Sequence, residues 1–339
     1  MRIHVVGAGV AGLTLAAASG AVRADLVLYE DGPDRGVGTA LGRWPAAMTA
    51  LDSIGAGSLV RRRGVFCTRG ELRRADGALL RTLPPSRVWL VRRGDLLAAL
   101  GACVPGTVLR VARRVTGIDD LDEVQPGDVV VGADGSRSVI RRELWGPPCR
   151  STGVTAVRGV VDEDLADGML REFWGAGAHF GTTPDPGGGT NWFATFAQRR
   201  LADRSDALDH ARRHLAGFPP GVQQVLAGAT PDRTLVNDVV RSRPLRHLHR
   251  GDVVLVGDAA HAMAPNLGRG ACEAVVDAVA LAHALRDHAA PAALTHYERQ
   301  RLLPPQAVRL AAGAAQRLSL APRHLWLRDV LVSGRLRPG

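Results

Sequence analysis

One stretch near the beginning of the chain, residues 2–31, constrains the fold more than any other. An apolar run of strand length, Ile3 to Val6, leads into the turn Gly7-Ala8-Gly9-Val10-Ala11-Gly12 and then into a helix of small residues. A second apolar run follows and ends on Glu30. A strand, a Gly-x-Gly-x-x-Gly turn, a helix and a second strand that ends on an acid predict a βαβ unit that binds a dinucleotide, either FAD or NAD(P).

Each part of this unit has a physical role in holding the nucleotide. Gly7 permits the tight turn, Gly9 leaves room for a pyrophosphate, and Gly12 lets the helix pack closely on the strand. The free N–H groups and the positive end of the helix would face the phosphates. Glu30 is placed to accept hydrogen bonds from ribose hydroxyls. A glycine-rich turn in an ordinary α/β protein would explain the glycines but not the acid.

The basic residues of the chain are unusual because all 43 of them are arginine, in a chain with a net charge of +10. We interpret the absence of lysine mainly as a bias in codon usage, with some arginines serving an anionic cofactor or substrate. The longest basic run, Arg61 to Arg63, has only Phe66 nearby, and aromatic residues make up 4% of the chain. A nucleic-acid surface is therefore not expected.

Cysteine spacing and hydropathy exclude further classes of protein. The four cysteines are scattered and form no Cys-x-x-Cys pair, so neither a metal site nor a disulfide framework is expected. No apolar stretch reaches the length of a membrane span, and the chain enters its first strand without a secretory signal. We therefore expect no membrane span and a cytoplasmic location.

Nucleotide-binding patterns occur in three separate parts of the chain. Short buried strands and helices alternate in residues 1–55, 90–145 and 250–290, whereas residues 150–245 are rich in strand patterns. The simplest organisation is a discontinuous α/β domain that carries an inserted β-rich (α+β) domain. The expected bounds are 1–70, 90–150 and 246–290 for the first domain, 71–89 and 151–245 for the inserted domain, and 291–339 for a C-terminal helical region.

Within these parts, some elements are clearer than others. The patterns predict strands at 153–161 and 190–197 and a helix over 203–217. Residues 31–42 are polar and rich in glycine, which favours a loop. The stretch 173–189 is rich in glycine and aromatic residues and is expected to contain a turn at its start.

A second motif, Asp134-Gly135, follows the buried strand expected at residues 128–132. The strand would deliver the carboxylate to a turn, and the glycine would permit a close approach of the backbone to a ligand. An Asx turn that caps the helix beginning at Ser138 is an alternative explanation.

A third motif, Gly257-Asp258, stands at the carboxyl end of another strand, where open α/β sheets bind their ligands. Asp258 could accept hydrogen bonds from ribityl or ribose hydroxyls. The loop Pro265-Asn266-Leu267-Gly268-Arg269-Gly270 leads into a helix over 271–286, whose positive end would face the same ligand. His261 lies in this motif, and a role in ordering the turn explains it better than a role as a base.

Together, the three motifs resemble those of the FAD-dependent monooxygenases with the para-hydroxybenzoate hydroxylase fold, relatives of salicylate hydroxylase and zeaxanthin epoxidase. The resemblance covers nearly the whole chain and depends on the order and spacing of the motifs. It implies a Rossmann-like FAD-binding domain with an inserted substrate domain. It also implies FAD as the cofactor, NADPH or NADH as the reductant and dioxygen as a co-substrate.

The resemblance further implies roles for single residues. Those expected to bind FAD come from all three motifs and from the helix that begins at residue 93, and they are Gly7, Gly9, Ala11, Gly12, Glu30, Asp31, Arg93, Asp134, Gly257, Asp258, Pro265, Gly268 and Gly270. The flavin ring would rest on Pro265, Asn266 and Gly268, beside the site of the reaction with oxygen, and no side chain is assigned as a base. A solvent-facing helix start is an alternative for Arg93. Glu273 departs from the glutamine or asparagine that relatives often carry.

The activity implied is the transfer of one oxygen atom from a flavin C4a-hydroperoxide to a small aromatic or unsaturated molecule, by hydroxylation or epoxidation. Strand position alone suggests the substrate residues Arg158, His179, Phe180, Trp192 and Phe196, although the aromatic ones could equally belong to the core of the sheet. Two alternatives stay open: an FAD-dependent dehydrogenase or reductase on the same fold, and a non-redox FAD-binding protein or cyclase. We expect a monomer or a homodimer.

Overall fold

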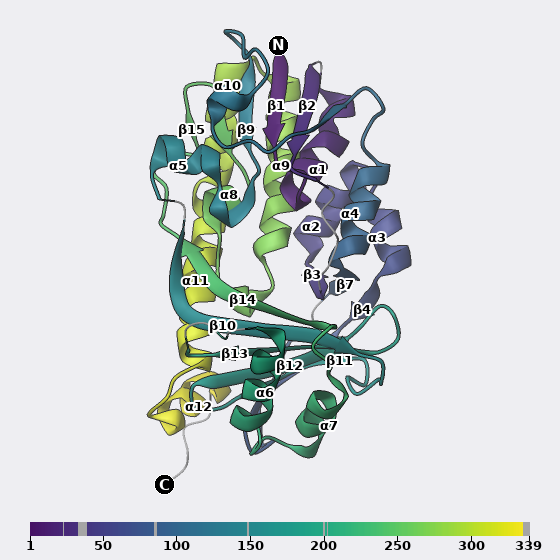
Figure 1. The fold of residues 1–339 in the computed structure, drawn as a ribbon, viewed down its shortest axis with the longest axis vertical. Helices are drawn as coiled ribbons and strands as arrows, with labels where there is room; N and C mark the ends of the chain where they lie inside the picture. The colour runs from purple at the N-terminus through teal and green to yellow at the C-terminus, as the bar shows by residue number, and fades with distance from the viewer. Residues whose placement is uncertain are drawn as a thin grey trace.

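A mostly parallel sheet forms the centre of the domain that carries the three motifs (Figure 1). The computed structural model describes residues 1–22, 24–32, 39–84, 87–147, 149–198, 201 and 203–334. The six strands, in spatial order, are β15 (His249–Arg250), β16 (Val253–Leu255), β9 (Val129–Gly132), β1 (Arg2–Val6), β2 (Asp25–Glu30) and β8 (Leu109–Ala112). β1 is parallel to both β2 and β9, so the carboxyl ends of the strands that carry the first two motifs lie at one edge.

Helices cover this sheet and bury its valine-rich strands. The helices of this domain are α1 (Val10–Ala18), α2 (Pro45–Ser53), α3 (Gly57–Arg63), α4 (Arg93–Ala102), α5 (Val139–Trp145), α8 (Asp258–His261), α9 (Gly270–Asp287) and α10 (Ala290–Arg301). α1 and α9 pack against each other, and both are rich in alanine. Their small side chains allow the first and third motifs to approach closely.

A seven-stranded sheet forms a second layer below the first domain (Figure 1). In spatial order its strands are β14 (Thr234–Ser242), β10 (Cys149–Val161), β13 (Thr190–Phe196), β12 (Ala178–Pro184), β11 (Met169–Trp174), β5 (Arg69–Arg74) and β6 (Leu79–Thr82). α6 (Arg204–His214) and α7 (Pro220–Gly228) cover the face that points away from the first domain. The opposite face therefore lies toward the nucleotide motifs.

A smaller sheet and the C-terminal helices connect the two layers. The small sheet consists of β3 (Ala40–Arg43), β7 (Val88–Arg92) and β4 (Val65–Cys67). α11 (Leu303–Ser319) runs along one side of the molecule from the first domain to the second layer, where α12 (Leu325–Ser333) follows (Figure 1). Pro304 and Pro305 lie in the first turn of α11, where a missing N–H donor does no harm.

The expected α/β class with a β-rich second layer and a helical C-terminal region is confirmed. Three local expectations need correction. The predicted loop over 31–42 ends in β3, with residues 33–38 outside the described part. The stretch 173–189 contains the whole of β12, and α7 was not predicted. β12 is buried on both faces, so its sequence does not alternate between polar and apolar residues.

Residues 335–339 of the C-terminal region also lie outside the described part. No helix in the described residues is both long enough and apolar enough to cross a lipid bilayer.

Candidate active site

The glycines of the first motif are required by close backbone contacts. Gly7 has φ +101°, and a Cβ there would lie 2.7 Å from the carbonyl oxygen of Ala133. A Cβ on Gly12 would lie 1.8 Å from the carbonyl oxygen of Gly7, so no larger residue fits there. At Gly9, in contrast, a Cβ would meet nothing within 4 Å. The turn therefore presents open space at the position where a pyrophosphate is expected.

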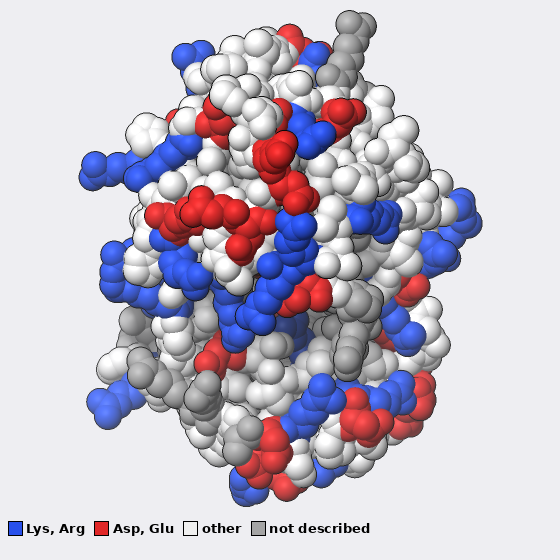
Figure 2. Space-filling view, turned by 45° about the horizontal axis from the view of Figure 1, so that its top comes forward, with Lys and Arg blue, Asp and Glu red and all other residues white. Residues whose placement is uncertain are grey.

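This space continues into a pocket of about 560 Å³, within the range typical of ligand sites. Residues far apart in the sequence meet in its wall, including Gly7, Gly9, Glu30, Asp31, Arg93, Arg113, Arg114 and Asp134. α1 begins at this pocket without a side-chain cap, so its free N–H groups point to the ligand space. On the face shown in Figure 2, arginine and acidic side chains lie side by side along the middle of the molecule. The pocket suits the adenosine and phosphate half of FAD.

The two carboxylate oxygens of Asp134 have different roles. Oδ2 accepts hydrogen bonds from the N–H groups of Val139, at 2.7 Å, and Ile140, at 3.3 Å, as the Asx-turn reading predicts. Oδ1 is buried and has no partner among the described residues. Burial raises the pKa of this carboxyl. An orphaned acceptor in the wall of the pocket is what a hydroxyl-rich ligand would satisfy, so the residues here fit FAD.

Glu30 faces the same turn. Its carboxylate accepts hydrogen bonds from the backbone N–H groups of Ala8, at 2.5 Å, and Asp31, at 3.1 Å. The acid therefore sits at the mouth of the glycine turn, as its position after β2 predicts. Ala11 is buried below it, and its methyl group would lie 3.1 Å from a Cβ on Gly257. Ala11 thus packs the first motif against the third and contributes no polar group to the pocket.

The third motif places a carboxylate beside the start of α9. Gly257 and Gly268 both have φ +59°, which favours glycine at each. The side chain of Asp258 is exposed, and its Oδ1 would lie 3.8 Å from a Cβ on Gly270, the first residue of α9. Pro265 and Gly268 are also exposed, so this loop has a surface free for a flavin ring.

Asn266 has a different position from its neighbours in the loop. Its Nδ2 donates a hydrogen bond of 3.1 Å to Oγ of Ser319, the last residue of α11. The side chain therefore ties the loop to the C-terminal helices. It would act on a bound flavin through the position of the loop.

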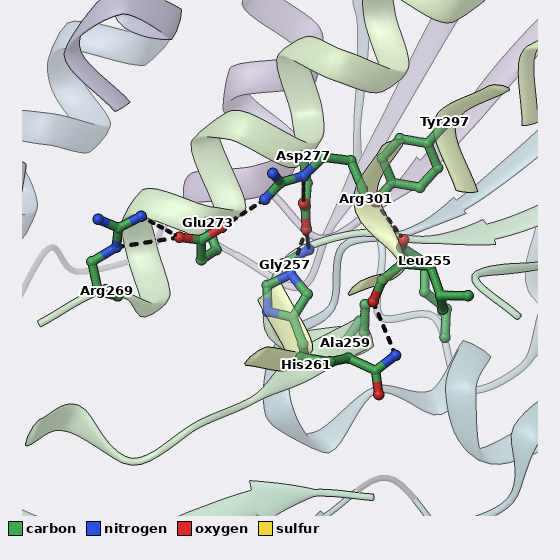
Figure 3. Close-up of polar contacts among 12 residues, drawn as sticks. Leu255, Gly257, Ala259, His261, Arg269, Glu273, Asp277, Tyr297 and Arg301 are labelled. Carbon is green, nitrogen blue, oxygen red and sulfur yellow. Dashed lines mark hydrogen bonds and ion pairs between the residues drawn. The ribbon is translucent and has the colours of Figure 1, made fainter. Parts of the chain in front are cut away.

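Beneath the third motif lies a buried chain of charges (Figure 3). His261 Nε2 lies 2.5 Å from Asp277 Oδ2, and Arg301 Nε donates to Asp277 Oδ1 at 2.7 Å. Arg301 Nη2 also donates to Glu273 at 2.6 Å, and Glu273 accepts from Arg269 at 2.7 Å. The chain therefore links the turn at residue 261 to the flavin loop at residue 269. Glu273 bridges Arg301 and Arg269 in this chain.

This chain fixes the turn that carries Asp258. Asp277 Oδ2 also accepts the N–H of Gly257 at 3.0 Å. Burial opposes charge on His261, but Asp277 outweighs it and holds the pKa of the imidazole above its ordinary value. In turn, His261 and Arg301 hold the pKa of Asp277 below its ordinary value, although burial opposes this. The expected ordering role of His261 agrees with these contacts.

The seven-stranded sheet presents a polar and aromatic face toward the first domain, which we call the inner face. Strand pairing places Arg158, Phe193, Gly181 and Glu172 in one row across four strands, so their side-chain positions share a face. Asn191, on the same face, accepts the backbone N–H of Ala40 from the small sheet at 3.2 Å. The inner face therefore lies opposite the nucleotide motifs.

Arg158 is the cation of the inner face. Its Nη2 donates to Asn237 Oδ1 at 2.9 Å, whereas its Nε is buried without a partner among the described residues. Burial and the nearby charge of Arg93 lower the pKa of this guanidinium. Arg93 also lines the nucleotide pocket and acts electrostatically on Asp258. One arginine therefore connects the cofactor pocket, the third motif and the inner face.

His179 also lies on the inner face, where both ring nitrogens approach polar atoms of neighbouring strands, although Nε2 makes no hydrogen bond among the described residues. Nε2 lies 3.3 Å from Glu172 Oε2, and Nδ1 lies 3.4 Å from Thr195 Oγ1. Burial opposes ionisation of Glu172, but His179 and the N–H of Trp174 hold the pKa of its carboxyl below its ordinary value. The side chain of His179 therefore shapes the wall of the site.

The aromatic candidates Trp192, Phe196 and Phe180 lie on the other face of the sheet. They belong to the core under α6 and α7, together with Leu208 and Val225. Side chains alternate along a strand, so placing Phe193 on the inner face puts its neighbour Trp192 behind it. Phe193 is the aromatic residue that strand position should have selected, because it pairs directly with Arg158.

Three comparisons agree with this arrangement. A model of the FAD binding domain family matches residues 119–311. The chain is 31% identical to aurachin C monooxygenase/isomerase of Stigmatella aurantiaca over 89% of this chain and 85% of that protein. It is 32% identical to 2-heptyl-3-hydroxy-4(1H)-quinolone synthase of Pseudomonas aeruginosa over 98% and 94%. Its fold is similar to Klebsiella pneumoniae HpxO complexed with FAD and uric acid, with a TM-score of 0.87, 26% identity, and coverage of 98% and 92%.

Proposed function

The chain belongs to the family of FAD-dependent aromatic monooxygenases, and from this premise we propose that its substrate is a small heteroaromatic ring that carries an acidic, enol-type oxygen. The observation that carries the proposal is Arg158, a cation with an unsatisfied buried N–H on the inner face. Such a group stabilises negative charge on a substrate oxygen. An ionised ring oxygen makes the neighbouring ring carbons more nucleophilic.

The names of the similar proteins support this class of substrate. A 4(1H)-quinolone and uric acid are both nitrogen heterocycles in which a carbonyl group is conjugated with a ring nitrogen. Both can place negative charge on an oxygen atom of the ring system. A molecule of this kind could lie flat against Phe193 with its oxygen toward Arg158.

The groups of the site divide between binding the cofactor and excluding water from it in the proposed reaction. When bound, FAD would take two electrons from NAD(P)H and activate dioxygen, of which one oxygen atom passes to the substrate and the other leaves as water. The glycine turn and Asp134 hold the nucleotide, while the loop at 265–268 supports the flavin ring. The apolar cluster of Val154, Ala156, Ala264 and Leu320 closes the space behind this loop against water.

On the inner face, the imidazole of His179 lies between Glu172 Oε2, at 3.3 Å, and Thr195 Oγ1, at 3.4 Å, so we do not assign it as the base. The substrate must therefore be acidic enough to ionise when it meets Arg158. This requirement favours acids such as urate over simple phenols, which ionise only near a pH of about 10.

The test is a screen of quinolones, purines and hydroxybenzoates for stimulation of NAD(P)H consumption by the FAD-loaded enzyme. We expect the acidic heterocycles to stimulate most, and the product to gain one labelled atom when the reaction runs under ¹⁸O₂. Products without the label would support the dehydrogenase alternative. Stimulation only by neutral alkenes would overturn the proposed role of Arg158.

We also propose a setting for this reaction. The cytoplasm supplies NAD(P)H, and the enzyme would act there as a monomer or a homodimer on diffusible small molecules. Cell fractionation and light scattering of the purified enzyme test these two points. Recovery of the enzyme in a membrane fraction, or a larger assembly, would contradict them.

A further inference from the structure

A second pocket, of about 530 Å³, lies between the seven-stranded sheet and α11, apart from the nucleotide pocket. The ends of β10 and β14 form one wall, and residues 309–320 form the other. The described residues that line it include five arginines and neither aspartate nor glutamate. These arginines are Arg150, Arg241, Arg243, Arg309 and Arg317. Such a concentration of one charge repels itself unless an anion neutralises it.

Two buried polar groups in this wall lack partners. Arg309 is 3% exposed, and its Nη1 donates to the carbonyl of Ser242, but its Nε has no partner among the described residues. Ser242 is 2% exposed, and its hydroxyl is also without a partner there. Buried donors are ordinarily satisfied, so both groups call for a ligand that accepts hydrogen bonds. An anion with several oxygen atoms would accept these hydrogen bonds and also neutralise the positive charge of the arginines.

The helix that borders the pocket is shaped around one of the arginines. Gly313 lies in the interior of α11, where glycine is less favourable than alanine. A Cβ at this position would lie 2.9 Å from Nη1 of Arg241. The glycine therefore leaves room for the Arg241 guanidinium to lie against the helix and line the pocket.

The pocket adjoins the flavin loop through shared apolar residues. Val154 and Leu320 line the pocket and also pack against Ala264, which precedes the loop at 265–268. Ser242, in addition, donates its backbone N–H to the carbonyl of Ala262 at 3.0 Å. A ligand bound here would lie one layer of side chains behind the loop that supports the flavin ring.

We propose that this arginine pocket binds phosphate groups, and that the phosphates are those of the nicotinamide dinucleotide that reduces the flavin. The second half of the proposal rests on the NAD(P)H-dependent activity proposed above. Arginine binds phosphate with paired, charge-assisted hydrogen bonds, which suits a pyrophosphate or a 2′-phosphate. The site supplies a place for the reductant in a chain that has no second Gly-x-Gly-x-x-Gly motif of the dinucleotide type.

The first experiment tests for phosphate binding without turnover. Thermal unfolding of the FAD-loaded enzyme is measured with inorganic pyrophosphate, with NADPH and with sodium chloride at equal ionic strength. We expect pyrophosphate and NADPH to raise the melting temperature and sodium chloride not to do so. If neither phosphate compound raises it, the pocket is not a phosphate site.

The second experiment identifies the source of the phosphate. In the double variant Arg150→Gln/Arg317→Gln, two exposed side chains lose their charge, so the fold should survive. We expect the KM for NADPH to rise at least about tenfold with FAD content unchanged. Arg62→Gln, on the exposed side of α3, is the matched control and should leave this KM unchanged. An equal rise for NADH indicates the pyrophosphate, and a rise for NADPH alone indicates the 2′-phosphate.

A third variant, Gly313→Ala, separates binding from unfolding. Alanine favours the helix, yet its methyl group displaces the Arg241 guanidinium. We expect a higher KM for NADPH together with an unchanged or higher melting temperature. If pyrophosphate stabilises the enzyme but none of these variants changes the KM, the pocket binds free phosphate compounds and the reductant binds elsewhere. If the wild type consumes no NAD(P)H, the proposed function fails while the thermal measurement still decides on the pocket.

Discussion

Arg158 is the residue on which the proposed substrate chemistry depends most, because its buried Nε is left for a ligand. Replacing it by methionine keeps an unbranched, flexible side chain of shorter reach and removes the charge. We expect Arg158→Met to lower kcat by about 10²-fold, comparable to the loss of one donor to a developing anion. The measurement is the amount of product formed per NAD(P)H consumed. This ratio should fall in the variant, because NAD(P)H is still oxidised when the substrate is not activated and no product forms.

Lysine at the same position provides the control for this prediction. Arg158→Lys restores a positive charge but not the paired donors, so we expect partial recovery of kcat. Equal activity of the methionine and lysine variants would show that the charge has no part in activating the substrate.

Gly12 provides a second test at the level of a single residue. A methyl group there would meet the carbonyl oxygen of Gly7 at 1.8 Å, so we expect Gly12→Ala to distort the turn and abolish FAD retention. The readout is the flavin absorbance of the purified protein. Gly101→Ala, in the last turn of α4 with nothing within 4 Å of the new Cβ, should stay yellow. A yellow Gly12→Ala protein with normal FAD affinity would contradict the packing argument.

Among the helices and strands, α9 supports the third motif at two places. Its first turn lies beside Asp258, and its middle holds the turn of the third motif through Asp277. Asp277 is satisfied by His261, Arg301 and a backbone N–H. Removing one member of such a buried set leaves the others with uncompensated charge, which costs about 3–5 kcal/mol of stability.

The His261–Asp277 pair predicts how stability depends on pH. The pKa of His261 is raised in the folded state from an ordinary value of 6.5. Its contribution is therefore fully present below pH 6.5 and is lost as the pH rises through the folded-state pKa. We expect the difference in unfolding free energy between wild type and His261→Gln, measured by urea denaturation, to be largest at low pH and to shrink in alkali.

A control on the same helix isolates this effect. His283 lies on the exposed face of α9, and His283→Gln should change the unfolding free energy little at any pH. A His261→Gln difference that grows with rising pH would show that the imidazole is buried in its neutral form.

For the whole molecule, FAD should act as a structural link between segments that are distant in sequence. The nucleotide pocket is lined by residues from 6–9, 29–32, 113–115 and 133–139, and the flavin loop adds residues near 265. A ligand that binds only the folded form stabilises it by about 2.7 kcal/mol at a free concentration of 100 times Kd. We expect removal of FAD to lower the melting temperature and its return to restore it.

FMN is the matched ligand for this prediction. It carries the flavin ring but lacks the adenosine half that the pocket beside Glu30 and Arg93 would hold. At equal concentration, FMN should therefore stabilise the apoprotein much less than FAD. Equal stabilisation by the two flavins would mean that this pocket does not receive the adenosine half.

The sequence alone identified the nucleotide-binding motifs, because each motif is formed by residues that are adjacent in the chain. Each motif combines the end of a strand with a backbone conformation that favours glycine, and a local pattern of this kind can be recognised in the sequence. The three motifs are the glycine turn, Asp134-Gly135 and Gly257-Asp258. The sequence also indicated the discontinuous organisation, because nucleotide-binding patterns occur on both sides of a β-rich segment, and the resemblance of its three motifs to a known family implied FAD.

Only the tertiary structure decided which side chains meet across the fold. The inner face contains Phe193 rather than Trp192, because strand register assigns alternate residues to opposite faces and a buried sheet hides that alternation. The charges at 261, 277 and 301 and the arginines of the second pocket come together from separate elements. Their meeting depends on helix packing over long sequence distances, which no local pattern records.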